Sequence, residues 1–328
     1  MSTGNRNTDW LLPLTPLYRA AIGAKNLVYD HGWCSPKRLQ WPVVSVGNLS
    51  VGGAGKTPLV IKLAQLLSVA GHSVDVLSRG YGRSSTETER VDVAGEASRY
   101  GDEPLLIAQK TGVPVYVGAS RYEAGVLAER EGAREGFHLL DDGFQHRKLA
   151  RDVDIVILHS SDFTQRLLPA GRLREPFSGL HRASMIVLRA EDALWEEELR
   201  RRGIQAPIWL QHRQLTVDPC GSAFAFCGIA RPEEFFMALR SNGVELAGTR
   251  AYRDHQAYSG AEMDEILRLA RASGAECCVT TEKDAVRLTQ AQREKLNAAI
   301  PLQVARLEVF LEDESTAMGQ LSSLLVRK

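Results

Sequence analysis

The chain has 328 residues, of which 44% are apolar and 24% charged, so it has the composition of a globular protein long enough for two domains. Its 40 basic and 40 acidic residues cancel, and this balance gives no indication of nucleic-acid binding. No segment reaches the roughly 20 apolar residues of a membrane-spanning helix, and the polar start lacks the apolar core of a secretory signal. Five cysteines without a C-x-x-C pair predict free thiols in a reducing, cytosolic compartment.

Residues 10–33 are predicted to form an amphipathic helix. Thr15 followed by Pro16 is typical of a helix start, and apolar residues recur after it at helical spacing. Four aromatic residues of the kind found at membrane interfaces accompany the segment: Trp10, Tyr18, Tyr29 and Trp33. The helix either packs against its own domain or lies on a membrane surface, and the pattern alone favours packing.

From residue 42 onward, β-rich segments alternate with helical patterns, which predicts an α/β fold with a mostly parallel sheet and helices on both faces. The predicted strands of this core are Val43–Val46, Val74–Leu77, Val113–Val117, Phe137–Leu140, Asp154–Leu158 and Met185–Leu188. Its predicted helices include Pro58–Val69, Leu105–Gln109 and Arg121–Glu131. We therefore expect an N-terminal helix (1–38), a core domain (39–212) and a smaller C-terminal α/β domain (213–328).

The C-terminal domain is predicted to begin with the strand Ala223–Cys227 and a helix near 233–241. Further strands are expected near 244–251, 276–280 and 301–309, with a helix near 260–272. In parallel sheets, ligands bind beyond the carboxyl ends of the strands. The loops at those ends are therefore the place to look for a site.

A glycine-rich loop lies between the first predicted strand and its helix. Glycines let the backbone aim its N–H groups at phosphate oxygens, and the helix start adds a dipole that favours anions. Lys56 would reach the β- and γ-phosphates and the Thr57 hydroxyl would bind Mg²⁺. The predicted nucleotide-binding residues are Ser50, Val51, Gly52, Gly53, Ala54, Gly55, Lys56 and Thr57. The usual first glycine of this motif is replaced by Ser50.

Two carboxylates, Asp141 and Asp142, follow the strand Phe137–Leu140. Adjacent carboxylates at such a place are often solvated turn residues. Beside a phosphate loop, a metal role for at least one of them is the better interpretation. The sequence does not distinguish between the two.

Eight segments in one order resemble the tetraacyldisaccharide 4′-kinase family of lipid A biosynthesis. They are SVGNLSVGGAGKTP (45–58), SRGYGR (78–83), YGDEP (100–104), LLDDGFQHRKLARDVDIVIL (139–158), LLPAGRLREP (167–176), FCGIARPEEFF (226–236), YRDHQAYS (252–259) and TTEKDAVRL (280–288). The resemblance implies an ATP- and Mg²⁺-dependent transfer of the γ-phosphate to the 4′-hydroxyl of a tetraacylated disaccharide 1-phosphate, which yields lipid IVA. Ser50 also agrees with the family, whose phosphate loop begins with a small residue.

The resemblance assigns Asp102 to deprotonating the acceptor hydroxyl and pairs it with His255. From local pattern alone, Asp102 reads as a helix cap and His255 as a surface loop residue. A carboxylate–imidazole pair can orient and polarise a sugar hydroxyl. We expect the C-terminal domain to close over the active site and bring His255 to Asp102. The family motif Asp-His-His reads Asp254-His255-Gln256 here, so its second histidine is replaced.

Further residues are candidates for binding ATP or the 1-phosphate of the substrate. Arginine forks suit phosphate oxygens, although an ion-paired loop explains the arginines near residue 172 equally well. The candidates are Arg79, Tyr81, Arg121, Gln145, Arg172, Arg174 and Glu175.

An acylated substrate changes the interpretation of residues 10–33 in favour of a membrane-lying helix, because a bilayer lipid is reached only from the interface. We therefore expect a peripheral enzyme at the cytosolic face of the inner membrane, with the lipid A precursor as its partner and no obligate protein partner. The main alternative is a membrane-associated P-loop ATPase switch that acts through partner binding. A kinase of a soluble small molecule would gain nothing from the aromatic N-terminal segment.

Overall fold

The computed structural model describes residues 8–326, which divide into two compact units. The first unit holds the residues up to Leu77, Arg121–His212 and those from Phe310 onward. The second holds Ser78–Ser120 and Arg213–Val309. This grouping differs from the predicted domains, because residues 78–120 belong with the C-terminal part and those from Phe310 onward belong with the core. Residues 78–120 group with the C-terminal part because ion pairs, described below, join residues 102–110 to residues 282–287.

The first unit is built on a parallel sheet in the order β8-β7-β6-β1-β5-β2. Its strands are β1 (Val43–Asn48), β2 (Val74–Ser78), β5 (Phe137–Asp141), β6 (Val153–Ile157), β7 (Met185–Arg189) and β8 (Ile208–Thr216). Its α-helices are α1 (Thr15–Asp30), α2 (Lys56–Val69), α5 (Arg121–Glu131), α6 (Glu196–Arg201) and α11 (Glu314–Val326). Short 3-10 helices are η1 (Asp9–Leu14), η2 (Ser160–Thr164), η3 (Phe177–Arg182) and η4 (Ala190–Trp195).

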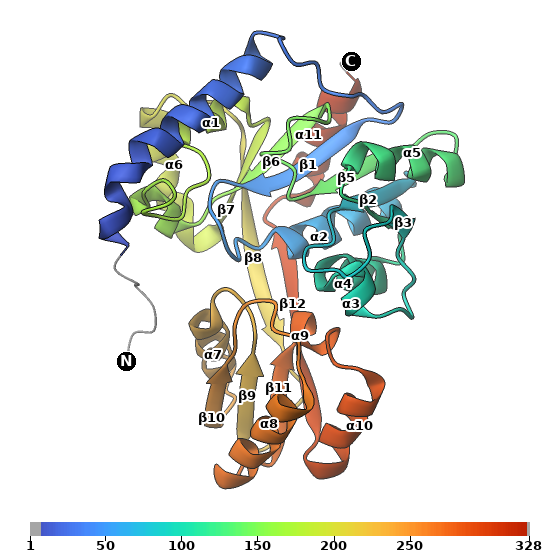
Figure 1. Ribbon diagram of the computed structural model, residues 1–328, viewed down its shortest axis with the longest axis vertical. Helices are drawn as coiled ribbons and strands as arrows, with labels where there is room; N and C mark the ends of the chain where they lie inside the picture. The colour runs from blue at the N-terminus through green and yellow to red at the C-terminus, as the bar shows by residue number, and fades with distance from the viewer. Residues whose placement is uncertain (1–7, 327–328) are drawn as a thin grey trace. The chain divides into compact units, whose positions relative to one another are not determined.

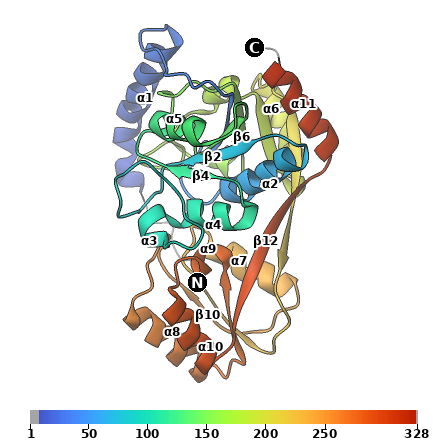
Figure 2. The same cartoon turned by 90° about the vertical axis from the view of Figure 1, so that its right-hand side faces the viewer.

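Every residue of β1, β2 and β6 is buried, as expected for strands covered on both faces. Val46 of β1 lies beside Asp141 of β5, so the strand before the phosphate loop and the strand before the paired carboxylates end next to each other. Figures 1 and 2 show α1 along the outside of this unit and α11 at its opposite edge. None of the helices in residues 8–326 is both long and apolar enough to cross a membrane.

The second unit contains parallel strands in the order β10-β9-β11-β12 and an antiparallel pair, β3 with β4. Its strands are β3 (Glu89–Arg90), β4 (Val115–Val117), β9 (Ala223–Cys227), β10 (Leu246–Ala251), β11 (Cys277–Thr281) and β12 (Leu302–Leu311). Its helices are α3 (Ala97–Tyr100), α4 (Asp102–Thr111), α7 (Pro232–Ser241), α8 (Gly260–Ala272), α9 (Glu282–Ala285) and α10 (Gln290–Ala299).

The residues of β9 alternate between two apolar clusters. Phe224 and Phe226 pack with α8 and α10, through residues such as Ile266 and Leu296. Ala223, Ala225 and Cys227 pack on the other side with residues of α7. The predicted α/β class, with a mostly parallel sheet and a second smaller α/β unit, is confirmed.

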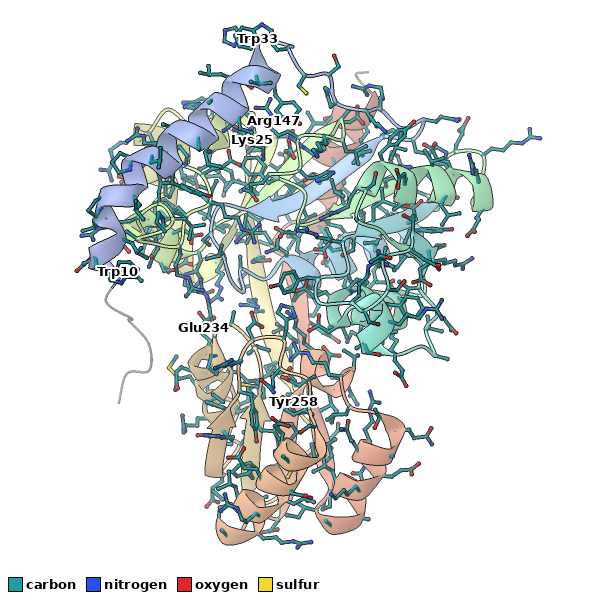
Figure 3. All side chains as sticks on the ribbon, in the orientation of Figure 1. Trp10, Lys25, Trp33, Arg147, Glu234 and Tyr258 are labelled. Carbon is teal, nitrogen blue, oxygen red and sulfur yellow. A yellow bond between two sulfur atoms is a disulfide. The ribbon has the colours of Figure 1, made fainter. Side chains whose placement is uncertain are left out.

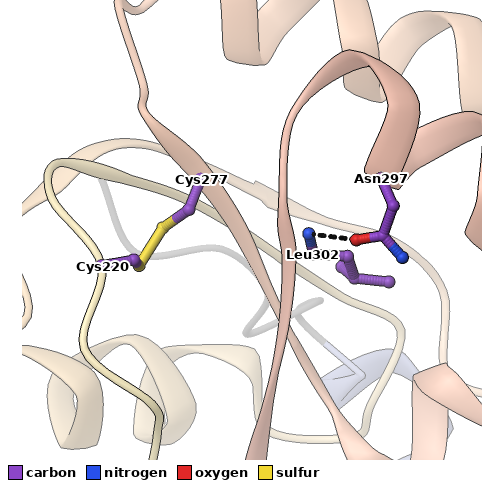
Figure 4. Close-up of a disulfide and its surroundings, with 4 residues drawn as sticks. All are labelled: Cys220, Cys277, Asn297 and Leu302. Carbon is purple, nitrogen blue, oxygen red and sulfur yellow. Dashed lines mark hydrogen bonds between the residues drawn. A yellow bond between two sulfur atoms is a disulfide. The ribbon is translucent and has the colours of Figure 1, made fainter.

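A disulfide joins Cys220, in the connection before β9, to Cys277 at the start of β11 (Figure 4). The expectation of free thiols is therefore wrong for these two residues. The sequence separates them by 57 positions, and only the pairing of β9 with β11 brings their Cα atoms within 6.2 Å. Cys34, Cys227 and Cys278 are free thiols.

Candidate active site

The predicted phosphate loop connects the end of β1 to the start of α2. Gly52 and Gly55 have φ angles of 99° and 90°, a region that side chains with a Cβ rarely adopt. Gly55 is the residue before the helix, so Lys56 and Thr57 occupy its first turn, where free N–H groups and the helix dipole attract anions. The loop therefore has the backbone geometry that its sequence predicts.

Asn48, which the sequence analysis did not single out, organises this loop from the end of β1. Its side-chain amide donates to the Ser50 carbonyl at 2.7 Å, and its Oδ1 accepts from Lys56 Nζ at 3.1 Å. Asn48 is fully buried. It thus holds both the beginning of the loop and the lysine at its end.

The segment 167–175 runs beside the phosphate loop. The Val51 N–H donates to the Arg172 carbonyl (2.8 Å), and the Arg174 N–H donates to the Leu49 carbonyl (2.7 Å). The Arg172 guanidinium donates to the Val51 carbonyl at 3.1 and 3.2 Å. Two of the predicted phosphate-binding arginines are therefore positioned at the loop by backbone pairing.

Asp142 faces two cations of the first unit. Arg174 Nη1 donates to its two carboxylate oxygens at 2.9 and 3.0 Å, and Lys56 Nζ lies 3.5 Å from Oδ1. Burial opposes its ionisation, but the charges of Lys56 and Arg174 outweigh burial and hold the pKa of Asp142 below its usual value. The Asp142 carboxylate is thus the anion that both Lys56 and Arg174 contact. Gln145 is nearby, because it accepts from Arg174 and donates to the Asn48 carbonyl.

The oxygens at this place fit a magnesium ion. Thr57 supplies a hydroxyl at the start of α2, and Asp141 and Asp142 supply carboxylates at the end of the neighbouring strand β5. Within the described residues, no three His, Cys, Asp or Glu side chains cluster as a metal cage. Mg²⁺ needs no such cage, because it keeps waters and substrate phosphates beside one or two carboxylates.

Asp102 is at the centre of a hydrogen-bond network in the second unit. Arg287 donates to its Oδ2 from Nε at 2.8 Å and from Nη2 at 2.6 Å. His255 Nδ1 lies 2.9 Å from the same oxygen, and the Glu103 N–H donates to Oδ1 at 2.9 Å. Burial disfavours the charged carboxylate, yet His255, Lys283 and Arg287 together hold the pKa of Asp102 well below its usual range.

The Asp102–His255 contact forms within a single unit, so no closure between domains is needed to make it. Asp102 is the first residue of α4 and not its cap, a position taken by Gly101 with φ 94°. A Cβ at Gly101 would approach the backbone of Gly80 to 3.0 Å, so glycine is required there. Gly101 therefore positions Asp102, which follows it, and packs closely against the loop that carries Gly80 and Tyr81.

Among the described residues, the non-glycine residues with positive φ are Asp142 (50°) and His255 (59°). Such backbone conformations are costly for residues with a Cβ and gather at functional sites. Asp142 belongs to the candidate phosphate site of the first unit, and His255 belongs to the Asp102 network of the second. Their backbone strain, which no sequence pattern reveals, marks the same two places as the motifs.

The replaced second histidine of the family motif does not disturb this network. Gln256 donates to the Ala257 carbonyl and to Glu262 in the first turn of α8. Ser259 and Glu262 form a capping box at the start of this helix. The retained histidine, His255, is therefore the one that contacts Asp102.

The other candidate residues lie in different surroundings. The Tyr81 ring lies 5.2 Å from the His255 ring, and it is exposed, as is Arg79. Arg121 is buried at the start of α5. Glu175 is buried and accepts from Arg182 (2.7 Å) and Asn26 (3.1 Å), so it is held by the protein's own cations and amides.

His146 makes the stability of the first unit sensitive to acid. Burial and the positive charges of Arg121 and Arg151 lower its pKa to about 4. As pH falls below the unfolded-state histidine pKa of about 6.5, the unfolded chain binds a proton at this residue and the folded protein does not. The free energy of unfolding therefore decreases as pH falls from about 6.5 to 4. We expect His146→Gln to reduce the fall in urea midpoint between pH 7 and pH 5. His31→Gln, at an exposed position, is the control, and equal falls in all three proteins would contradict the expectation.

A model of the family described as tetraacyldisaccharide-1-P 4′-kinase (LpxK) matches residues 8–325. The chain belongs to this family. The tetraacyldisaccharide 4′-kinase of Koribacter versatilis is 43% identical over 329 residues, covering 96% of this chain and 99% of the relative. That of Pelobacter propionicus is 38% identical and covers 96% and 92%. The crystal structure of LpxK from Aquifex aeolicus in complex with ATP is similar, with a TM-score of 0.79 and 32% identity over 97% of this chain and 99% of that one.

Membership of the 4′-kinase family confirms the resemblance drawn from the eight segments. Three residues of the site were not singled out from the sequence: Asn48, Lys283 and Arg287. Each lies inside a segment that carries the resemblance, SVGNLSVGGAGKTP or TTEKDAVRL. The family resemblance therefore included these three residues, but no local sequence pattern indicated what each of them contacts.

Proposed function

We propose that this protein transfers the γ-phosphate of ATP to the 4′-hydroxyl of a tetraacylated glucosamine disaccharide 1-phosphate and so produces lipid IVA. Membership of the 4′-kinase family supports this activity. The observation that carries it beyond nucleotide binding is the Asp102–His255 contact at 2.9 Å. A P-loop switch has no use for a carboxylate–imidazole pair suited to a hydroxyl.

In this proposal the first unit supplies the ATP-binding residues. The loop 50–57 wraps the phosphates, and Lys56 and Arg174 exchange the carboxylate of Asp142 for phosphate oxygens. Charge-assisted contacts of this kind stabilise the negative charge that the transferred group carries. Arg172 supports the phosphate loop by donating to the Val51 carbonyl, and Gln145 supports Arg174 by accepting from its guanidinium.

Thr57 and the carboxylates of Asp141 and Asp142 would hold Mg²⁺. When bound, the ion would neutralise charge on the β- and γ-phosphates. Loss of the Asp142 contacts to Lys56 and Arg174 on nucleotide binding would leave that carboxylate available. Asp141, the second carboxylate, is buried at the end of β5.

The second unit supplies the acceptor-binding residues. Asp102 takes the proton from the 4′-hydroxyl, and His255 orients the carboxylate by donating to it. Most of the rate gain comes from positioning and charge neutralisation, because phosphoryl transfer needs little covalent help. The exposed Tyr81 ring beside His255 and the exposed Arg79 are suited to contacting the sugar or its phosphate.

Incubation with γ-labelled ATP and the tetraacylated disaccharide 1-phosphate tests the activity directly. The expected result is labelled lipid with the label at the 4′ position. ATP hydrolysis without labelled lipid would instead favour the ATPase switch. Labelling of a soluble sugar but not of the acylated disaccharide would favour a small-molecule kinase.

We further propose that α1 lies on the membrane that holds the substrate. Three of its polar residues contact its own unit: Tyr18 donates to the Arg174 carbonyl (3.0 Å), Asn26 to Glu175, and Lys25 to the Gln145 carbonyl (3.2 Å). No residue of α1 is buried. Figure 3 shows Lys25 and Arg147 on the side of the helix that faces the sheet, and Trp10 and Trp33 at its two ends.

Large apolar side chains are exposed along this segment: Trp10 (76%), Leu17 (70%), Leu27 (54%) and Trp33 (77%). Such a patch on a helix held by polar contacts is typical of an interfacial helix and not of one packed by its apolar face. It supports peripheral binding at the cytosolic face of the inner membrane, where anionic lipids attract basic side chains.

Replacing Leu17, Leu27 and Trp33 by serine is expected to lower cosedimentation with anionic vesicles by about tenfold or more, because apolar burial drives interfacial binding. ATP hydrolysis or binding in solution should be unchanged. The matched control replaces the equally exposed Val69 and Leu194, which lie outside this segment, by serine. Undiminished cosedimentation of the triple variant would place the membrane contact elsewhere.

A further inference from the structure

His255 lies between an anion and a cation of its own unit. Its Nδ1 is 2.9 Å from Oδ2 of Asp102, and its Nε2 is 3.4 Å from Nζ of Lys283. An ionised carboxylate only accepts hydrogen bonds and an ammonium group only donates them. A neutral imidazole has one donor and one acceptor, so these contacts assign the proton to Nδ1 and the lone pair to Nε2.

Lys283 is itself fixed in place. Its Nζ lies 2.8 Å from Glu103 Oε1, and its side chain is only 20% exposed. Burial disfavours its charge, but Glu103, Asp102 and Asp254 outweigh burial and raise the pKa of Lys283 above its usual value. Lys283 is therefore a permanent donor beside Nε2.

The charged groups that contact His255 come from three segments of the second unit. Asp102 belongs to α4, Lys283 to α9, and Asp254, whose Oδ1 is 3.8 Å from Nε2, precedes His255 in its loop. The Tyr81 ring covers the imidazole at 5.2 Å. Of these, only Lys283 offers a hydrogen-bond donor to Nε2 at close range.

We propose that Lys283 is a positioning residue that keeps His255 in the tautomer with its proton on Nδ1. In the other tautomer, a lone pair on Nδ1 would face the Asp102 carboxylate, and two acceptors do not bond. Lys283 therefore acts on Asp102 through His255. It donates to Nε2 of the imidazole, and the Nδ1–H of the same ring donates to the Asp102 carboxylate. The consequence for rate rests on the proposed kinase function, but the tautomer assignment does not.

The chain contains a matched control for this residue. Two lysine–glutamate pairs link α4 to α9, Lys283 with Glu103 (2.8 Å) and Lys110 with Glu282 (2.6 Å). The two lysines are similarly buried, with 20% and 24% of their side chains exposed. Lys283 contacts His255, whereas Lys110 is paired with Glu282, the residue before Lys283. Lys110→Met thus removes an equivalent ion pair without removing the donor to Nε2.

Long-range proton–nitrogen NMR of ¹⁵N-histidine-labelled full-length protein reads the tautomer directly, and His255→Gln identifies the signal. We expect the Nδ1–H form in the wild type, in Lys283→Arg and in Lys110→Met, and a gain of the Nε2–H form in Lys283→Met. An Nε2–H signal in the wild type would overturn the proposal, even if Lys283→Met failed to fold. So would an unchanged Nδ1–H signal in folded Lys283→Met.

Kinetics supply the second readout. Lys283→Met is expected to lower kcat by about tenfold or more, within the range of an oriented acid–base group, while KM for ATP stays within about twofold. Lys283→Arg should recover most of kcat, because arginine is also a pure donor. Equal losses in Lys283→Met and Lys110→Met would assign Lys283 a merely structural role. Absence of lipid product with the wild type would contradict the kinase function but leave the NMR result standing.

Discussion

Replacing Lys56 with alanine is expected to lower kcat for lipid phosphorylation by about a hundredfold to a thousandfold, the usual loss when one charge-stabilising donor is removed. Lys56 is the only cation that the loop's own sequence carries, and its ammonium group is held by Asn48 within reach of Asp142. The assay follows transfer of label from γ-labelled ATP to the acylated disaccharide. Lys56→Ala also removes one of the two cations paired with Asp142, which can change stability. Folding of the variant is therefore checked by thermal unfolding.

Lys62→Ala is the control for this experiment. Lys62 lies on the same helix, α2, and is ion-paired with Glu314 of α11. Its removal costs a partly buried ion pair of the first unit but leaves the phosphate loop intact. A Lys56→Ala enzyme as active as Lys62→Ala would show that the loop does not bind the transferred phosphate.

Asp102→Asn and His255→Ala are each expected to lower kcat by about a hundredfold to ten-thousandfold, because each removes half of one acid–base pair. The double variant should be little worse than either single one, since residues that act as a unit give non-additive losses. The measurement is kcat for lipid phosphorylation in all four members of the cycle. Losses that simply multiply would show that the two side chains act independently.

Stability must be followed in the same cycle. Asp102 is the partner of the buried Arg287, and loss of its charge leaves that guanidinium with Asp284 alone (3.0 Å). Breaking a buried pair in this way destabilises a protein by up to about 3–5 kcal/mol, and the remaining carboxylate reduces that cost. His255→Ala leaves the Arg287 pair untouched. A lower kcat in His255→Ala at unchanged Tm therefore separates catalysis from folding.

The periodic elements of the fold were predictable from the sequence. Strands such as Val43–Val46 and Val74–Leu77 are short valine-rich runs with one polar residue each, and the helix 260–272 has both a capping box and a regular apolar face. The helices α10 and α11 were not predicted. In α10 only Leu296 is buried, so its sequence has almost no apolar periodicity to detect.

The candidate site was predictable where a motif determines local backbone, as in the loop 50–57. It was not predictable where distant segments meet. Lys283 and Arg287 contact residues more than 150 positions away, and no spacing rule connects them to Asp102. The same contacts explain why residues 78–120 group with the C-terminal part of the chain.

The chain passes between its two units four times, after Leu77, Ser120, His212 and Val309. A protease that cuts one of these connections leaves the two halves covalently tied by the other three. Neither half corresponds to a single stretch of gene, so neither could have been gained or lost by one fusion or truncation at an end. The two structural units of this chain are therefore expected to be inherited together.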